Sequence, residues 1–325
     1  MKVSHFQSPL VTVIIPFFNR ELFLDEAIQS IINQSFKDWE LILVDDGSTD
    51  SSNSIAKKYI NQYPQKIFLF NHQDRQRLGA SASRNVGIKN AKGKFVTFLD
   101  SDDVLYPQTI AKELEAFQLN PKADVVCGTL DYWHSWSTEN NQTEIDFTAN
   151  LGVKLEKLYA PPSLLIHNLI AGGRKPGINC VMVKKDFINS IGAFEGDFRH
   201  VSEDQVFWSK ISLNGKIYVM DASLARYRQH NNSSCAVLIK SENETENWEV
   251  FLNWLEEYLK ENNLSNQEVW TALLSCRKEI RLQHTFRKIK KIYRQLLPLH
   301  TRYWLRDKII SWRLLKKRFF TSKKS

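Results

Sequence analysis

Cysteine is scarce in this sequence of 325 residues, with only four that stand far apart and form no Cys-x-x-Cys pair. The scarcity argues against a disulfide framework or a structural zinc site, and it favours a reducing compartment. No apolar run approaches the roughly 20 residues that a membrane-spanning helix needs, and the N-terminus has no signal-peptide segment. We therefore expect a cytoplasmic protein, either soluble or peripheral on the inner face of the cell membrane.

Three common catalytic motifs are also missing. The sequence has no G-x-x-x-x-G-K-[ST] loop, no G-x-G-x-x-G after the first expected strand and no G-x-S-x-G elbow. P-loop nucleotide hydrolases, dinucleotide-binding enzymes and the usual serine hydrolases therefore have no support.

Charge is divided unevenly along the chain. Residues 277–325 hold 17 basic and 2 acidic residues, or +15, and the remaining 276 hold 44−17 = 27 basic and 36−2 = 34 acidic residues, or −7. Apolar residues recur at helical spacing in the basic segment, as in Trp304 and Trp312. Two readings stay open: a helix on an anionic membrane surface, or a helix packed on the body with a solvated basic face. No nucleic-acid-binding motif accompanies the charge, so we expect no nucleic-acid partner.

Strand and helix patterns alternate through the first 130 residues. β-branched runs predict strands at 11–15, 39–44, 67–70, 94–99 and 123–130, and amphipathic stretches between them predict helices. Such alternation is typical of an α/β fold with a doubly wound, mostly parallel sheet. Residues 131–177 are less regular, residues 178–227 again show strand and helix patterns, and the chain beyond 241 has a helical pattern.

Acidic residues follow two of the expected strands. Asp100-Ser101-Asp102-Asp103 directly follows a buried strand, and Asp45-Asp46 ends another. Ligands of parallel sheets bind beyond the carboxyl ends of the strands. Oxygen ligands of this kind suit Mg²⁺ or Mn²⁺ completed by substrate phosphates, and carboxylates accept hydrogen bonds from a base or a ribose. Both clusters could instead be polar turns that cap the following helix.

The order of the motifs resembles that of family 2 glycosyltransferases of the GT-A fold. The resemblance covers about residues 9–235 and rests on six segments: 11–19 (VTVIIPFFN), 43–50 (LVDDGSTD), 82–87 (ASRNVG), 98–103 (FLDSDD), 191–204 with Glu203-Asp204, and 227–233 with Tyr-Arg-Gln-His. It implies a Rossmann-like sheet, a nucleotide-sugar donor (usually a UDP-sugar) and a divalent metal. The implied division is a catalytic domain at 1–240, with a nucleotide-binding half at 9–130 and an acceptor half at 131–240, followed by a helical basic extension at 241–325.

The resemblance also implies roles for single residues. Asp204 would be the general base, Asp102 would hold the metal, and His230 would be a further metal or diphosphate ligand. The residues implied to bind the nucleotide are Pro16, Phe18, Asn19, Glu21, Asp45, Asp46, Arg84 and Asp100, of which Asp46 would bind the base, Arg84 would lie near the diphosphate and Asp100 would face the ribose or the metal.

Weaker candidates lie toward the acceptor or the diphosphate. Glu203 adjoins Asp204, although adjacent residues do not share a helix face. Arg174 and Lys175 follow Gly172-Gly173 and could contact the diphosphate, or they could be an ordinary solvated basic pair. Trp133 could stack on an acceptor sugar, or it could pack in the core. His230 could likewise be a loop histidine with a structural role.

We therefore expect a metal-dependent, inverting glycosyltransferase of the hexosyltransferase type. It would move a sugar from a nucleoside-diphosphate sugar to a glycan or lipid-linked acceptor in the synthesis of cell-surface polysaccharide or glycolipid. A sugar nucleotidyltransferase would need a glycine-rich loop after the first strand, where residues 16–20 have no glycine. A non-catalytic sugar-nucleotide or glycan-binding module is the other alternative, and Asp102 and Asp204 argue against it.

Overall fold

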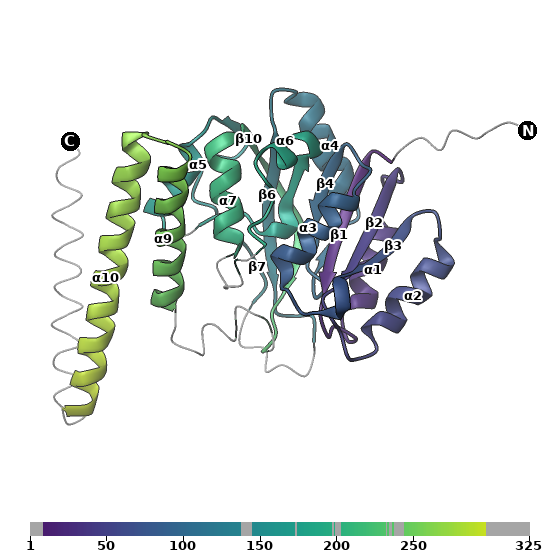
Figure 1. Ribbon diagram of the computed structural model, residues 1–325, viewed down its shortest axis with the longest axis horizontal. Coiled ribbons are helices and arrows are strands. Elements are labelled where there is room, and N and C mark those ends of the chain that lie inside the picture. The colour runs from purple at the N-terminus through teal and green to yellow at the C-terminus, as the bar shows by residue number, and fades with distance from the viewer. Residues whose placement is uncertain are drawn as a thin grey trace, which may run out of the picture. The chain divides into compact units, whose positions relative to one another are not determined.

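The computed structural model describes residues 9–137, 145–172, 174–196, 198, 203–231, 233, 236 and 244–296. The chain divides into two compact units, Met1–Cys276 and Arg277–Ser325. The first unit is built on one twisted sheet with helices on both faces (Figure 1). Among the described residues, no helix combines the length and the apolar character needed to cross a bilayer.

One half of the sheet is parallel. Strands β3, β2, β1 and β4 lie side by side in that order and all run in the same direction. Their bounds are β1 Val11–Phe17, β2 Trp39–Asp45, β3 Ile67–Asn71 and β4 Phe95–Phe98. Because they are parallel, their carboxyl ends meet at one edge of the sheet, and the acidic segments follow β2 and β4 there.

The other half of the sheet is mixed. Strand β9 (Val181–Lys184) runs antiparallel between β4 and β6 (Val125–Trp133), and β10 (Ile217–Arg228) runs parallel to β6. Short antiparallel strands complete it: β5 Val104–Leu105, β7 Phe147–Thr148 and β8 Lys157–Tyr159. The inserted strand β9 joins the two halves into a continuous sheet.

Alternate residues of β1 enter opposite cores, as the pleat of a strand requires. Val13 and Ile15 pack on one face beside α1 (Leu24–Ile32), α2 (Ser52–Gln62) and α4 (Thr109–Leu119). Ile14 packs on the other face beside α3 (Ala80–Asn90), α6 (Lys185–Ser190) and α7 (Glu203–Asn214). The sequence-based expectation of an α/β fold with a Rossmann-like sheet is confirmed. Three shorter helical elements lie within the same part of the chain: α5 Ser163–Ile170 and the short turns η1 Gln73–Arg75 and η2 Ile178–Cys180.

The first compact unit extends past residue 240. Helix α9 (Glu244–Glu261) packs against α7, with Phe251 and Leu255 buried. Helix α10 (Gln267–Leu296) begins in the same unit, where Leu273 is buried, and continues into the second. The expected boundary at 240 lies in a stretch outside the described residues, and so do the expected helical residues after 296.

Candidate active site

The loops that follow β1 and β2 are tied together by hydrogen bonds. The backbone N–H groups of Thr49 and Ser51 donate to Asn19 Oδ1 and Glu21 Oε2, at 2.8 and 3.0 Å. In return, the N–H groups of Arg20 and Glu21 donate to side chains of the second loop, at 2.7 and 3.0 Å. Asn19 and Glu21, which the family resemblance assigned to the nucleotide pocket, thus use side-chain oxygens to shape this edge of the sheet.

The paired acids after β2 are buried and already hydrogen-bonded. Asp45 accepts from the N–H of Ser48 and from Asn53 Nδ2, as a turn-forming Asp does. Asp46 accepts the N–H groups of Leu78 and Gly79, at 2.7 and 3.0 Å, just before α3 begins. Asp46 therefore ties the residues just before α3 to the end of β2, and these bonds do not cap α2, the helix that follows Asp46 in the chain.

Gly47, directly after this pair, adopts a φ of +87°. A Cβ atom on Gly47 would lie 2.6 Å from the backbone oxygen of Arg75, so a larger residue would push the two loops apart.

Pro16 and Phe18 lie on either side of the end of β1. Pro16 is buried inside the strand, opposite Val44 of β2. Phe18 is half-buried, and the guanidinium of Arg77 lies 4.1 Å from the centre of its ring. Phe18 and Arg77 therefore form one wall at the carboxyl end of β1.

Arg84 joins three carboxylates from two distant parts of the chain. Its Nη2 atom lies 2.7 Å from Asp100 Oδ1, and its Nη1 atom lies 2.9 Å from Glu203 Oε1 and 3.8 Å from Asp204 Oδ1. Burial alone would lower the pKa of Arg84, but these three charges raise it above its ordinary value. Arg84 is thus a permanently charged link between the end of β4 and the start of α7.

Asp100 is affected differently from Arg84. Its burial raises the pKa and the neighbouring Arg84 lowers it, while the charges of Asp204 and Asp102 raise it again, to about 6. The cause is a crowd of carboxylates around one guanidinium, which favours the neutral acid.

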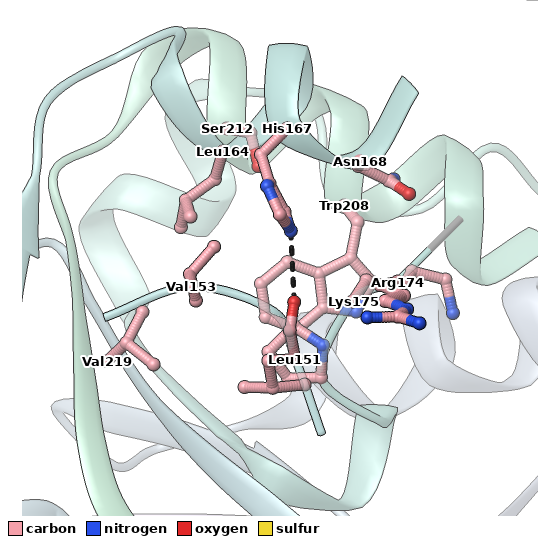
Figure 2. A pocket seen from close by; sticks show the side chains of 11 residues that line it. Leu151, Val153, Leu164, His167, Asn168, Arg174, Lys175, Trp208, Ser212 and Val219 are labelled. Carbon is pink, nitrogen blue, oxygen red and sulfur yellow. Dashed lines mark hydrogen bonds between the residues drawn. The ribbon is translucent and has the colours of Figure 1, made fainter. Parts of the chain in front are cut away.

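Asp204 has a second cationic neighbour. Lys175 Nζ lies 3.8 Å from Asp204 Oδ2. Figure 2 shows Arg174 and Lys175 beside Trp208 in a small pocket next to α7. Trp208 is one helical turn after Asp204, so the two residues share a face of α7. The pocket therefore adjoins Asp204. Of the two basic residues that the sequence singled out, Lys175 reaches this carboxylate, whereas Arg174 lines the pocket and is exposed.

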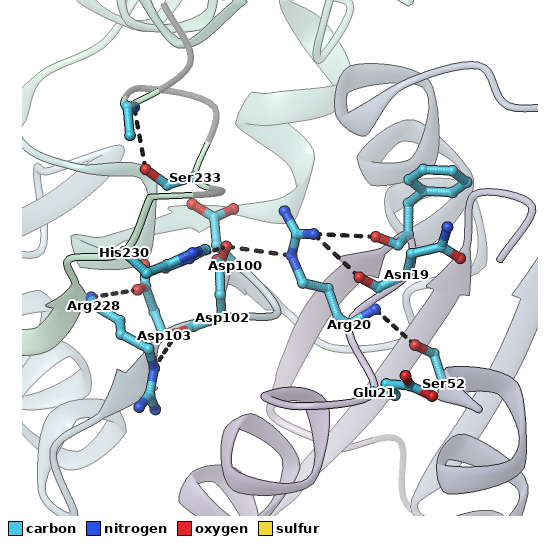
Figure 3. Close-up of polar contacts among 12 residues, drawn as sticks. Asn19, Arg20, Glu21, Ser52, Asp100, Asp102, Asp103, Arg228, His230 and Ser233 are labelled. Carbon is cyan, nitrogen blue, oxygen red and sulfur yellow. Dashed lines mark hydrogen bonds and ion pairs between the residues drawn. The ribbon is translucent and has the colours of Figure 1, made fainter. Parts of the chain in front are cut away.

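Asp102 faces away from Arg84 toward a different pair of residues. His230 Nε2 lies 3.2 Å and Arg20 Nε lies 3.3 Å from the same oxygen, Asp102 Oδ2 (Figure 3). Burial would raise the pKa of Asp102, but the hydrogen bond from His230 and the charge of Arg20 outweigh it and hold the pKa below its ordinary value. The ionised form of Asp102 is therefore favoured.

The Asp102 and His230 side chains fit a divalent cation only in part. No group of three His, Cys, Asp or Glu side chains with metal-ligand geometry occurs among the described residues. Mg²⁺ and Mn²⁺ are usually held by one or two protein ligands and completed by substrate phosphates and water. A carboxylate oxygen and an imidazole nitrogen that lie 3.2 Å apart match such a half-site, which a diphosphate would complete.

The next aspartate of the turn, Asp103, has a structural role. It is fully buried and accepts hydrogen bonds from Asn179 Nδ2 and from the N–H of Arg228. Asn179 in turn accepts the N–H of Asp100 at 2.7 Å. These bonds hold the acidic turn on β10 and η2.

An aromatic cluster surrounds Arg228 next to the acidic turn. The guanidinium lies 4.5 to 5.2 Å from the ring centres of Trp133, Trp136 and Phe23. Its Nε atom donates to the backbone oxygen of Asp102 at 2.8 Å. Trp133, the candidate for stacking on an acceptor sugar, therefore already stacks on a buried cation, and the cluster braces the turn that carries Asp102.

The structure thus brings most of the candidates to one edge of the sheet. Two connected groups form there, one around Arg84 and one around Asp102. Sequence reasoning gave no role to Arg20 and Arg228, although Arg20 follows Asn19 directly and Arg228 lies inside the segment 227–233, two residues before His230.

Known proteins similar to this chain agree with the fold. A glycosyltransferase of Haemophilus influenzae described as uncharacterized is 42% identical over 33% of this chain, and the minor teichoic acid biosynthesis protein GgaB of Bacillus subtilis is 30% identical over 73% of it. The chain spans 41% and 25% of the lengths of these two relatives. The putative teichuronic acid biosynthesis glycosyltransferase TuaG of Bacillus subtilis is 29% identical, over 69% of this chain and 81% of TuaG.

Solved structures show the same fold at low sequence identity. S. aureus TarS 1-349 in complex with UDP-GlcNAc is 19% identical and has a TM-score of 0.60, over 90% of this chain and 77% of that one. The mannosyltransferase PcManGT from Pyrobaculum calidifontis, in complex with GDP-Man and Mn2+, has a TM-score of 0.55 at 14% identity, over 98% of this chain and 84% of that one. The sequence model of "Glycosyl transferase family 2" matches residues 12–174. This match covers half of the chain, which therefore belongs to glycosyl transferase family 2.

Proposed function

We propose that this protein is a metal-dependent, inverting glycosyltransferase that moves a sugar from a nucleoside-diphosphate sugar to a hydroxyl group of a glycan or a lipid-linked acceptor. A UDP-sugar is the first donor class to test, because a structural neighbour binds UDP-GlcNAc. Synthesis of cell-surface polysaccharide is the proposed role, because relatives are named for teichoic and teichuronic acid biosynthesis.

One observation carries the proposal. Arg84 binds Asp100 at the end of β4 and Glu203 at the start of α7, and it lies 3.8 Å from Asp204. Asp102, two residues after Asp100, faces His230 on the other side. The residues proposed to hold a donor and the residue proposed to activate an acceptor therefore belong to two neighbouring groups, which the turn from Asp100 to Asp102 joins.

Each group has a definite task in this proposal. Asp204 accepts the proton of the acceptor hydroxyl, whose oxygen bonds to the sugar carbon as the bond from that carbon to the diphosphate breaks. Attack on the face opposite the leaving group inverts the configuration. Asp102 and His230 would hold a divalent cation, which when bound stabilises the negative charge of the departing diphosphate.

Lys175 and the pocket beside Trp208 adjoin the proposed base. The ammonium group of Lys175 lies 3.8 Å from Asp204 Oδ2, at the side of the carboxylate that faces this pocket residue. We therefore propose that the acceptor hydroxyl binds beside Lys175 and Trp208, which line this pocket (Figure 2).

The test separates binding from transfer. Nucleoside-diphosphate sugars are screened with and without Mn²⁺ for protection against thermal unfolding, since a bound donor stabilises the fold by mass action. The Asp204→Asn variant should keep this protection and lose transfer by about 10²- to 10⁴-fold. Asp186→Asn, an equal change at an exposed position of α6, should behave as the wild type.

Two results would contradict the proposal. Transfer that persists in Asp204→Asn would remove this residue as the base. Donor binding without detectable transfer to any acceptor by the wild type would favour a non-catalytic binding module instead.

We also propose that residues 277–325 bring the enzyme to an anionic membrane surface on the cytoplasmic side, near a lipid-linked acceptor. This segment carries 17 basic and 2 acidic residues. In its described part, Leu282, Phe286 and Ile289 of α10 are 45%, 64% and 44% exposed, and their spacing of four and three residues puts them on one helix face.

Vesicle sedimentation tests the membrane proposal. The full chain should bind vesicles of phosphatidylserine and phosphatidylcholine, and should not bind vesicles of phosphatidylcholine alone. Phe286→Ser should weaken binding, whereas Leu119→Ser should not, although Leu119 on α4 is also exposed. Equal loss in both variants, or no binding at all, would contradict the proposal.

A further inference from the structure

The carboxylate of Asp102 already has a cationic partner within the chain. Arg20 Nε lies 3.3 Å from Asp102 Oδ2, the oxygen that His230 Nε2 approaches to 3.2 Å. Both side chains are mostly buried, with 24% of Arg20 and 15% of Asp102 exposed. Figure 3 shows the guanidinium between the acidic turn and the loop after β1. Arg20 thus occupies part of the half-site proposed for a divalent cation.

The backbone of Arg20 is fixed, whereas its head is held only by weaker contacts. Its N–H donates to Ser52 Oγ at 2.7 Å, which anchors the residue to the loop after β2. Its Nη1 atom donates to the carbonyl oxygens of Phe18 and Asn19, at 3.3 and 3.2 Å. Within the described part of the chain, Nη2 makes no hydrogen bond. The head can therefore leave Asp102 without disturbing the loop.

A divalent cation and a guanidinium compete for one carboxylate oxygen, because like charges repel at this separation. We propose that Arg20 is a displaceable counter-ion: it neutralises Asp102 before a divalent cation binds, and turns to the donor's diphosphate when the cation takes its place. This inference rests on the proposed function and adds to it a residue that couples metal binding to donor binding.

Cooperativity follows from the exchange of partners. A cation that binds alone must remove Arg20 from Asp102 and gives the guanidinium no new anion. When a diphosphate is present, the guanidinium gains charge-assisted hydrogen bonds to phosphate oxygens, which its planar fork matches well. Metal and diphosphate therefore strengthen each other's binding by the same factor.

Mn²⁺ binding to the full chain, followed by electron paramagnetic resonance without any nucleotide, tests the inference directly. Arg20→Gln should bind Mn²⁺ about tenfold more tightly than the wild type, because nothing competes for Asp102. Arg20→Lys keeps the charge and should lie between the two. Arg75→Gln removes an equal charge from an exposed position near the same edge of the sheet and should stay within about twofold of the wild type.

A second series adds UDP at a fixed concentration. UDP should tighten Mn²⁺ binding in the wild type, and this factor should shrink by about tenfold in Arg20→Gln. Far-ultraviolet circular dichroism and the melting temperature establish that each variant is folded. If the wild type binds Mn²⁺ alone too weakly to measure, binding to Arg20→Gln should become measurable, and absence of binding to both would overturn the inference.

Asp102→Asn separates the two possible failures. Equal Mn²⁺ binding by the wild type and Asp102→Asn would contradict the metal site of the proposed function itself. Binding that depends on Asp102 but does not tighten in Arg20→Gln would contradict only the role of Arg20.

Discussion

Asp100 and Asp102 lie two residues apart in one turn, yet they face different partners and respond oppositely to them. Asp100 contacts Arg84 among other carboxylates, and its pKa is raised to about 6. Asp102 contacts His230 and Arg20, and its pKa is lowered. Burial raises the pKa in both cases, so the difference comes from the neighbours.

The comparison shows that one turn can supply carboxylates to two different parts of the proposed active site. The Asp100 side leads through Arg84 to Glu203 and Asp204, where acceptor activation is proposed. The Asp102 side leads to the loop after β1 and to the end of β10, where the donor's diphosphate and a cation are proposed to bind. The two carboxylates contact different partners, so the two groups meet only at this turn.

The largest effect is expected from Arg84, the cation of the Asp100 side. Arg84→Gln leaves three carboxylates without their buried partner and should lower the free energy of unfolding by about 3–5 kcal/mol. Arg20→Gln, on the Asp102 side, should cost about 1 kcal/mol or less, because its ion pair is partly solvated. Urea denaturation measures the free energy of unfolding of both variants. Equal decreases in the two would contradict the difference expected between Arg84 and Arg20.

A third carboxylate, Glu113 of α4, extends the comparison of Asp100 with Asp102, because it shows a buried carboxylate without polar partners among the described residues. It is 0% exposed, neither of its oxygens has a hydrogen-bond partner among the described residues, and burial raises its pKa well above the ordinary value. Glu113 therefore contributes most to the free energy of unfolding at a pH below its pKa in the unfolded chain. This contribution is lost as pH rises through its pKa in the folded protein.

Glu113→Gln cannot ionise and should escape this loss. Above the raised pKa of the wild-type residue, the variant should be more stable than the wild type by about 1–3 kcal/mol, with a difference that shrinks at acidic pH. Glu113→Leu should stabilise the fold at both ends of the pH range. Thermal unfolding measured from pH 5 to pH 9 tests this prediction. A stability difference between Glu113→Gln and the wild type that does not change with pH would show that ionisation of Glu113 is not its cause.

The smallest effect is the pH dependence of the turn itself. Asp100 stabilises the fold below pH 3.8 and loses this contribution as pH rises through about 6, whereas Asp102 contributes above pH 3.8 and loses its contribution as pH falls through its lowered pKa. Asp100→Asn should therefore remove a downward slope of stability between about pH 4 and 6. Carboxyl carbon NMR titration checks both groups, and similar midpoints would contradict the comparison.

Much of the parallel half of the sheet could be predicted from the sequence, because short β-branched runs there alternate with amphipathic helices. Helix α5 was missed, since its eight residues lie in a stretch without a clear period. Strand β10 lies in the region 178–227, where the sequence showed only a general strand and helix pattern, and it runs on to Arg228 past an irregularity after Val219. Pairing with β6 extends this strand, and local residue types cannot reveal such a partner.

The part of the candidate site that could be predicted from the sequence consists of polar residues that come directly after a strand. The acidic residues after β2 and β4 fall at one edge because the strands are parallel. The sequence could not show which basic side chains form ion pairs with these acidic residues. Arg84 and Glu203 are 119 positions apart, and Arg20 and Asp102 are joined only because the loop after β1 folds back over the acidic turn.

The interlocked loops after β1 and β2 have a consequence for engineering. All the hydrogen bonds described between these loops fall within residues 19–52. A chimera that keeps this contiguous stretch with its strands, and exchanges the segment around α7 for that of a relative with a glutamate at position 203, would preserve these loop contacts and the partner of Arg84. Recombination between family members could then alter which alcohol is glycosylated while the choice of sugar nucleotide is inherited intact.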